Sequence, residues 1–424
     1  MIQTFVDFFR NKDIRKKIYF TLAMLFIFRL GAAIPAPGIN DTIINIADNS
    51  ILGMMNLLGG GAIEQMSIFS LGVGPYITAS IIIQLLSMDI IPALTEMTKS
   101  GKKGRQQMDQ ITRYLGVVLA FVQGYFIVQM LSNQYGIVDN PSPIKYMYIA
   151  TIFTAGTMFL LWIGDQITTK GVGNGVSMII FAGIVANIPS SFRTIYSILL
   201  GSGVTTKGVI SFVMYIVMFI AIIVLVTAMQ MAERRIPIQY TTSQTINRTK
   251  GDINHLPLKI NSASVIPVIF ASALIQGPQI ITSWINQGAY QWLRDFFDFT
   301  KPYVLVIYGI LIILFTFFYT NLTVDPEKIA EDLVKQGTYI PGIRPGHETK
   351  EYVSKVLNRI TVLGALLLTF IAILPYVITI VFGLPQGAAT GGTGIIIVVG
   401  VAMETTKALK GQLTQKQYRG FVGK

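Results

Sequence analysis

Residues 54–86 read MMNLLGGGAIEQMSIFSLGVGPYITASIIIQLL, a hydrophobic stretch with an interruption near its start. The part from Ile68 to Leu86 is apolar enough to enter a bilayer, whereas Ile51 to Leu58 is too short to cross about 30 Å of hydrocarbon. The interruption combines glycine with polar residues: Asn56, Gly59, Gly60, Gly61, Glu64 and Ser67. Because a run of glycines cannot hold a lipid-exposed helix, we expect this segment to lie where protein or water surrounds it. It predicts movable, non-helical backbone at mid-depth, followed by a complete span over 68–88.

The composition predicts a polytopic membrane protein. Of the 424 residues, 52% are hydrophobic and only 13% are charged, whereas a soluble domain carries about a quarter charged residues. The absence of cysteine excludes disulfides, a thiolate nucleophile and a cysteine-ligated metal. His255 and His347 are far apart in polar loops, so we expect no histidine-based catalytic or metal site and no cofactor.

Ten apolar segments are long enough to be interpreted as membrane spans. They lie near residues 18–35, 68–88, 113–132, 146–166, 174–198, 208–232, 262–283, 302–322, 358–382 and 393–410. The loops on the side away from the termini carry few of the 33 basic residues: Lys145, Arg193, Lys207, Arg294 and Lys301. Since Lys and Arg concentrate in cytoplasmic loops, this distribution predicts that both termini are cytoplasmic.

The chain divides into two sets of five spans. Five precede a connector at 199–207 and five follow it. Because five is odd, an N-terminal half (residues 1–200) and a C-terminal half (residues 201–424) would have opposite orientations, as in channels and transporters built from inverted repeats. The count permits such a repeat and does not by itself establish one.

Two cytoplasmic loops, 233–261 and 323–357, are longer than topology requires. They contain HLPLK at 255–259 and YIPGIRPG at 339–346, in which proline and glycine around Arg344 predict a rigid turn. A shaped, basic loop indicates a docking site for a cytosolic partner, although a solvated connector remains an alternative. The net charge of +12 does not decide between a docking site and a connector, because topology together with attraction to anionic lipid explains it equally well.

No segment matches a nucleotide-binding loop. SGKKGR at 100–105 lacks the spacing of a phosphate loop, and GVGNG at 171–175 lies between two spans, where a tight turn is expected. Any energy for transport must therefore come from a partner.

Ionisable residues are scarce at mid-membrane, which argues against a proton- or sodium-coupled carrier. Arg29 lies toward the outer end of the first span, where we expect it to snorkel or to pair with a carbonyl at a helix end. Several polar residues nevertheless occur within spans: Thr78, Ser80, Gln84, Asn187 and Gln276. They predict an interior that is partly wet or that separates reversibly.

Eight ordered motifs resemble those of the SecY family of protein-translocating channels, and they run through nearly the whole chain. They are FRLGAAIPAPGI (28–39), MSIFSLGVGPYITASIIIQLL (66–86), GTMFLLWIGDQIT (156–168), KGVGNGVSMIIFAGIVANIP (170–189), HLPLK (255–259) with VIPVIFAS (265–272), YIPGIRPG (339–346), LNRITVLGA (357–365) and GGTGIIIVVGV (391–401).

The resemblance implies an all-α polytopic membrane protein whose ten transmembrane helices form two inverted, pseudo-symmetric five-helix halves around a central pore. It implies the pore-forming subunit of a passive channel, not an enzyme, that moves unfolded secretory proteins across a bacterial cytoplasmic membrane. The channel would also release membrane proteins sideways, between spans two and three and spans seven and eight.

The resemblance also assigns four groups of residues. The narrowest point is a ring of aliphatic side chains: Val73, Ile77, Val176, Ile180, Ile269 and Ile397. The segment at about 54–67 resembles a plug that closes the pore, and it contains the six residues of the interruption. The residues assigned to partner docking are Arg344, Arg234, Arg235, Arg248, Lys250 and Lys259. The residues assigned to the lateral gate, the boundary through which sideways release occurs, are Thr78, Ser80, Gln84 and Gln276.

The implied partners are SecE-like and SecG-like small membrane subunits, a SecA-type motor ATPase, the ribosome, signal sequences and nascent chains, and anionic lipid. Two departures from the family pattern stand out. The segment 241–252 has a sparse basic run, which puts the affinity of this loop for partners in doubt, and two ring positions are valine, which loosens the ring slightly.

An aliphatic ring suits a channel for unfolded chains, because it offers no specific hydrogen bond and dewets when empty. We expect the glycines of the plug to let it leave with little packing to break. Two other functions are compatible with ten spans. A secondary transporter needs a polar site at the midplane, which we do not find, and a scaffold without a pore leaves the glycine-broken segment unexplained.

Overall fold

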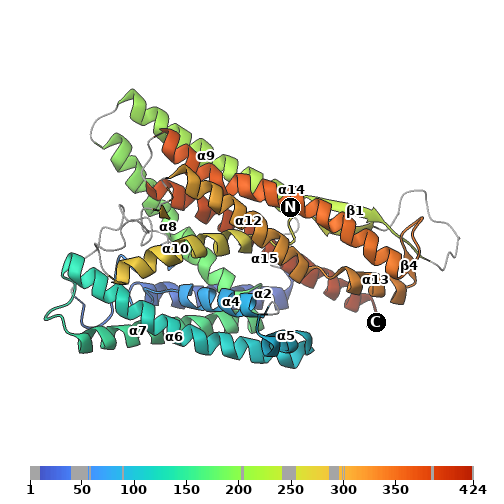
Figure 1. The fold of residues 1–424 in the computed structure, drawn as a ribbon, viewed down its shortest axis with the longest axis horizontal. Coiled ribbons are helices and arrows are strands. Elements are labelled where there is room, and N and C mark those ends of the chain that lie inside the picture. Colours follow the sequence, from blue (N-terminus) through green and yellow to red (C-terminus); the bar gives the residue numbers. More distant parts are fainter. Residues whose placement is uncertain are drawn as a thin grey trace.

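The structure, a computed structural model, describes residues 10–39, 56, 59–87, 90–201, 205–240, 255–285, 296–297, 299, 301–382 and 386–422. Helices account for most of these residues, and the long ones lie side by side (Figure 1). The first half contains α2 (Lys12–Ala32), α4 (Gly74–Leu86), α5 (Pro92–Lys99), α6 (Gly101–Tyr135), α7 (Pro143–Lys170) and α8 (Gly175–Leu200). The second contains α9 (Thr206–Met231), α10 (Ile266–Ile285), α12 (Pro302–Thr323), α13 (Pro326–Lys335), α14 (His347–Phe382) and α15 (Gln386–Val422).

Each predicted span overlaps one of these helices. Within the described residues, seven helices are long and apolar enough to cross a membrane, in α6, α7, α8, α9, α12, α14 and α15. The apolar helices Gly74–Leu86 and Ile266–Ile275 are shorter. The class is therefore confirmed, and the count of ten spans remains a prediction.

The second predicted span is wrong at its start. Residues 68–73 form turns, and α4 begins at Gly74 with Pro75 in its first turn. Its 13 residues reach about 20 Å, too short to cross the hydrocarbon alone. Gly72 has a φ of +56°, which favours glycine and stops the helix from extending backwards. The interruption in the hydrophobic stretch is thus longer than the glycine run.

Local sequence explains where other helices begin. The side chain of Asn11 accepts hydrogen bonds at the start of α2, and those of Ser142, Asn174 and Asp325 do so at α7, α8 and α13. The turn predicted at 171–175 is confirmed. Gly173 has a φ of +73°, and a Cβ on Gly175 would lie 1.8 Å from the carbonyl oxygen of Gly164, so α7 and α8 approach closely.

The described parts of the two long loops of the second half, 233–240 with 255–261 and 323–357, form one unit at the end of the bundle that carries α5, α13 and the C-terminus (Figure 1). Strand β1 (Glu233–Pro237) pairs antiparallel with β3 (His255–Lys259), and β2 (Gln239–Tyr240) pairs with β4 (Thr338–Tyr339). Ile236, Leu258 and Val353 are buried in its own small core. We call this unit the strand module.

The halves meet along a shared apolar core. Ile81 of α4 and Ile195 of α8 are buried in a cluster whose other buried residues come from the second half. Helix α8 also packs against α15 and α9. The helices of one half therefore cover those of the other around the predicted ring.

Candidate pore ring, plug, gate and docking surface

The six predicted ring residues lie in one hydrophobic cluster. They come from four helices or their first turns: Val73 and Ile77 at α4, Val176 and Ile180 on α8, Ile269 on α10 and Ile397 on α15. Val73, Ile180 and Ile397 are buried, and the other three pack partly buried against them. Two of the helices belong to each half, so the cluster joins the halves at their centre.

Side chains of this kind can exclude water and ions but cannot bind them specifically. Each ring residue is a branched aliphatic with no hydrogen-bonding group. Ile77 and Ile269 also pack against the apolar core shared by the two halves, which contains Ile81 and Ile195, so they connect the ring to that core. A surface of this composition yields to any passing side chain without leaving a polar partner unpaired.

The described residues of the predicted plug, Asn56 and 59–67, fold back on themselves, and residues 54, 55, 57 and 58 lie outside those described. Oδ1 of Asn56 accepts hydrogen bonds from the backbone N–H of Ile63 at 3.1 Å and of Glu64 at 3.2 Å, and its carbonyl accepts from Gly61 at 2.8 Å. Burial is the main cause that raises the pKa of Glu64 above its ordinary value, and its hydrogen bond with the Asn56 side chain partly offsets it. Asn56 thus organises the plug.

The glycines of the plug allow its backbone to approach α8 closely. Gly60 and Gly61 have φ values of +75° and +83°. A Cβ on Gly60 would lie 3.1 Å from Cα of Gly183, and one on Gly61 would lie 2.9 Å from Oδ1 of Asn187. These residues therefore let the backbone lie directly on α8, and the expectation that glycine leaves little packing to break stays a prediction.

Two side chains outside the plug hold its backbone. Nη1 of Arg29 donates to the carbonyl of Gly60 at 2.5 Å, and Nδ2 of Asn187 donates to the carbonyl of Asn56 at 3.3 Å. Arg29 does pair with a carbonyl, but that carbonyl lies in a turn of the plug and not at a helix end as expected. Sequence analysis interpreted Arg29 as structural and Asn187 as one of the polar residues of a partly wet interior, and the contact of either residue with the plug carried no local signal.

The plug is continuous with a tightly anchored turn. Phe69 inserts between two helices at glycines, since a Cβ on Gly31 would lie 2.1 Å from its ring and one on Gly156 3.2 Å from it. Ser67 bridges to Pro35, and the N–H of Ala36 donates to the carbonyl of Met66 at 2.9 Å. Residues 67–73 are thus fixed between α2 and α7.

The predicted gate residues fall into three groups. The hydroxyl of Tyr319 on α12 donates to Oε1 of Gln84 on α4, and Nε2 of Gln84 donates to Oγ of Ser80 at 3.0 Å. Thr78 instead donates to the carbonyl of Gly74 in its own helix. The side chain of Gln276 lies outside those described. Tyr319, which sequence analysis missed, supplies a polar contact between the halves.

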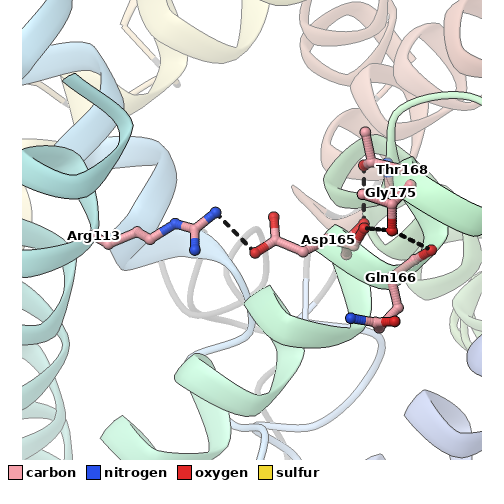
Figure 2. Close-up of polar contacts among 7 residues, drawn as sticks. Arg113, Asp165, Gln166, Thr168 and Gly175 are labelled. Atoms are coloured by element: carbon pink, nitrogen blue, oxygen red, sulfur yellow. Dashed lines mark hydrogen bonds and ion pairs between the residues drawn. The ribbon is translucent and has the colours of Figure 1, made fainter. Parts of the chain in front are cut away.

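A half-exposed ion pair ties two helices of the first half together. Nη2 of Arg113 on α6 lies 2.8 Å from Oδ2 of Asp165 on α7 (Figure 2). In the same view, the N–H of Gly175 donates to Oγ1 of Thr168 at 2.9 Å, which fixes the turn into α8. The predicted gate helix α6 is therefore held to the body of its own half.

The predicted docking residues that the structure describes lie on the strand module. Arg344, Arg234, Arg235 and Lys259 are exposed, and Arg248 and Lys250 fall outside the described residues. Arg235 pairs with Glu233 at 2.9 Å, whereas Nη1 of Arg344 lies 3.8 Å from Oε1 of Glu348. The Arg344 side chain is 88% exposed, so it is free to meet a partner.

A basic side chain also joins two helices of the second half. Nζ of Lys407 on α15 donates at 2.6 Å to the carbonyl of Gln230, at the end of α9 and directly before β1. A cation is favourable at a helix C-terminus. Among the described residues, no group of three or more His, Cys, Asp or Glu side chains could hold a metal ion.

Comparison with known proteins identifies close relatives of the whole chain. The SecY family model matches residues 67–406. Protein translocase subunit SecY of Staphylococcus epidermidis is 45% identical over 432 aligned positions, covering 100% of both chains. The corresponding subunits of Staphylococcus carnosus and Staphylococcus aureus are 44% and 45% identical, also over the full length of both chains.

Solved structures share the fold at lower sequence identity. A protein-conducting channel matches with a TM-score of 0.66 and 20% identity, covering 93% of this chain and 91% of that one. A SecY structure solved to study how its plug domain stabilises the closed channel matches with a TM-score of 0.68 and the same identity and coverage. Sec61 in a canine ribosome–channel complex matches with a TM-score of 0.65 and 20% identity, again with 93% and 91% coverage.

Proposed function

The chain belongs to the SecY family of protein translocase subunits, and on that premise we propose that it forms the pore through which unfolded polypeptides cross a bacterial cytoplasmic membrane. The observation that carries the proposal is the gathering of six aliphatic residues from both halves in one central cluster. A secretory chain passes through this ring, which yields to any side chain and closes against ions when empty.

The plug seals the ring between transport events. Its backbone lies against α2 and α8, and the buried residues Ala62 and Val73 belong to the same cluster. Displacement of the plug opens a path, and its return restores the seal. The two halves, residues 1–200 and 201–424, enclose this path and move apart to widen it.

Sideways release occurs where α4 and α6 face α10 and α12. An apolar segment in the pore leaves for lipid there, because its transfer from water gains roughly 0.8 kcal/mol per buried CH₂ group. A polar segment continues across the membrane. The contact of Tyr319 with Gln84 lies on this boundary and supports the assignment.

The chain supplies no energy of its own in this proposal. A SecA-type motor ATPase or the ribosome docks on the strand module through Arg344 and its basic neighbours Arg234, Arg235 and Lys259, and through Arg248 and Lys250 in the same loop. Sec61, which shares the fold, was solved in a complex with the ribosome. SecE-like and SecG-like subunits complete the channel, and anionic lipid attracts its basic face.

The strand module and both termini lie in the cytoplasm. This orientation is supported by the concentration of Lys and Arg in the loops on that side. A direct test reconstitutes the chain with its small subunits in vesicles and supplies motor, ATP and a labelled secretory precursor. We expect the precursor to become protected from added protease, and absence of protection with a competent motor would overturn the proposal.

A further inference from the structure

Two of the polar contacts that hold the plug are made by its backbone. Asn56 and Gly60 each offer a carbonyl to a side chain from another element, Asn187 on α8 and Arg29 on α2. A carbonyl is the same group in every residue, so these two contacts do not depend on the identity of the plug side chains. The glycine backbone is what allows α8 to approach closely enough to make them.

The two donors differ in strength. The guanidinium of Arg29 carries a full charge, and its 2.5 Å contact is a charge-assisted hydrogen bond. The amide of Asn187 is neutral and its contact is 3.3 Å long. Loss of the first contact should therefore loosen the plug more than loss of the second.

Both donors belong to the first half, and so do the other hydrogen-bond partners of the described plug residues. Ile63 and Met66 are buried in a cluster formed by residues of α6, α7 and the segment after α2. The backbone at Met66 and Ile68 bonds with Ala36 and Ile34. Among the described residues, each hydrogen bond from the plug to another element reaches the first half.

The boundary between the halves has its own polar contact, from Tyr319 to Gln84. This contact joins α12 to α4 and involves no plug residue. Separation of the halves at that boundary leaves Arg29 and Asn187 on the same side as the plug they hold.

We infer that Arg29 and Asn187 form a two-point latch that fastens the plug to the first half by hydrogen bonds, so that plug release and sideways opening are separate events. The inference rests on the proposed function, since it concerns when that channel opens. Freeing the plug requires breaking the two carbonyl contacts, whether or not the halves have moved apart.

The test measures plug release without any client polypeptide. The chain has no cysteine, so Ala62→Cys provides a single thiol at a position that is fully buried while the plug is seated. In membranes that contain the complete channel complex, a membrane-impermeant maleimide added outside labels this thiol only when the plug leaves. Because no transport is required, the result does not depend on whether polypeptides cross the ring.

We expect Arg29→Met to raise the labelling rate by about tenfold or more and Asn187→Leu by about fivefold. Arg29→Lys, which keeps a cationic donor, should restore part of the seal. Arg193→Met removes an exposed arginine from α8 and should leave the rate unchanged. Tyr319→Phe, which weakens the contact between the halves, should also leave it unchanged.

Three outcomes would overturn the inference. The first is a labelling rate in Arg29→Met and Asn187→Leu equal to that of the Arg193→Met control. The second is a rise in Tyr319→Phe as large as in the latch variants, which would mean that opening between the halves releases the plug. The third is rapid labelling of Ala62→Cys in the otherwise unchanged chain. Export of an unaltered precursor by each variant shows that it is folded.

Discussion

The hydroxyl of Tyr319 on α12 donates a hydrogen bond to the side-chain carbonyl of Gln84 on α4, and so joins the two halves at the boundary where sideways release is proposed. The ring of Tyr319 packs edge-on against Phe270 of α10 at a centroid separation of 4.9 Å. Phe270 directly follows the ring residue Ile269. A single side chain thus touches both sides of the boundary and a neighbour of the constriction.

Replacing Tyr319 with phenylalanine should make sideways opening easier. The change removes the hydroxyl and keeps the aromatic packing, and loss of one such hydrogen bond costs about 1 kcal/mol, or roughly fivefold in an equilibrium. We expect segments of lower apolarity to enter the membrane. The measurement is the fraction of test segments of graded hydrophobicity that integrate rather than cross.

A matched control lies on the same helix. The hydroxyl of Tyr308 is buried in the second half and has no hydrogen-bond partner among the described residues. Tyr308→Phe makes the same chemical change without touching the boundary, so its integration threshold should stay at that of the unchanged chain. Equal thresholds for Tyr319→Phe and Tyr308→Phe would show that the contact with Gln84 does not restrain the gate.

Polar substitution in the ring should break the seal. In Ile269→Asn or Ile397→Asn an amide that holds water replaces a branched aliphatic group, so the constriction stays hydrated when empty. We expect a higher ion leak and export of precursors with weakly apolar signal sequences. Conductance across a planar bilayer measures the first effect. Ile269→Val should behave like the parent, and unchanged conductance and selectivity in the asparagine variants would count against the ring assignment.

Charge reversal at Arg344 should disable docking while leaving the channel folded. Arg344 is exposed and its ion pair with Glu348 is long, so Arg344→Glu breaks little inside the chain. We expect motor-driven export to be lost. Lys328→Glu makes a similar change on α13 and should export normally. Normal export by Arg344→Glu would refute the docking role.

Plug seating should depend on external pH through Glu64. Burial raises the pKa of Glu64 in the seated plug, so the seated state binds a proton more tightly than the displaced, solvated state. The proton-linked stabilisation is therefore fully present below the ordinary value of 4.5 and is lost as pH rises through the raised pKa. We expect less ion leak at acidic external pH. Glu64→Gln should abolish this dependence, and a dependence that persists in Glu64→Gln would assign it to another group.

The sequence predicts the parts of this structure that depend on local pattern. Each apolar segment overlaps a helix, and the turn at 171–175 lies where its glycines indicate. The ring residues were assigned by resemblance, and the structure brings all six together. The boundary of α4 was missed because Phe69 anchors the preceding turn between α2 and α7, a tertiary contact that hydropathy does not register.

The polar contacts of the site could not be predicted from one sequence. Arg29 and Gly60 are 31 residues apart, Asn56 and Asn187 are 131 apart, and Gln84 and Tyr319 are 235 apart. Each member alone is a polar residue within or near an apolar span, which also fits a purely structural role. Only the folded arrangement shows which side chains reach the plug and which cross between the halves.

The central claim is that a polypeptide passes through the aliphatic ring, and the absence of native cysteine makes a direct measurement possible. A single cysteine at Ile269 is combined with a secretory chain that carries its own cysteine and is stalled in mid-transit. A cysteine at Ile310, exposed on the outer face of α12, serves as the control. We predict a disulfide at Ile269 whose yield follows the stalled position, and none at Ile310. Continued export with no crosslink at Ile269 would mean that the chain travels elsewhere and would contradict the account.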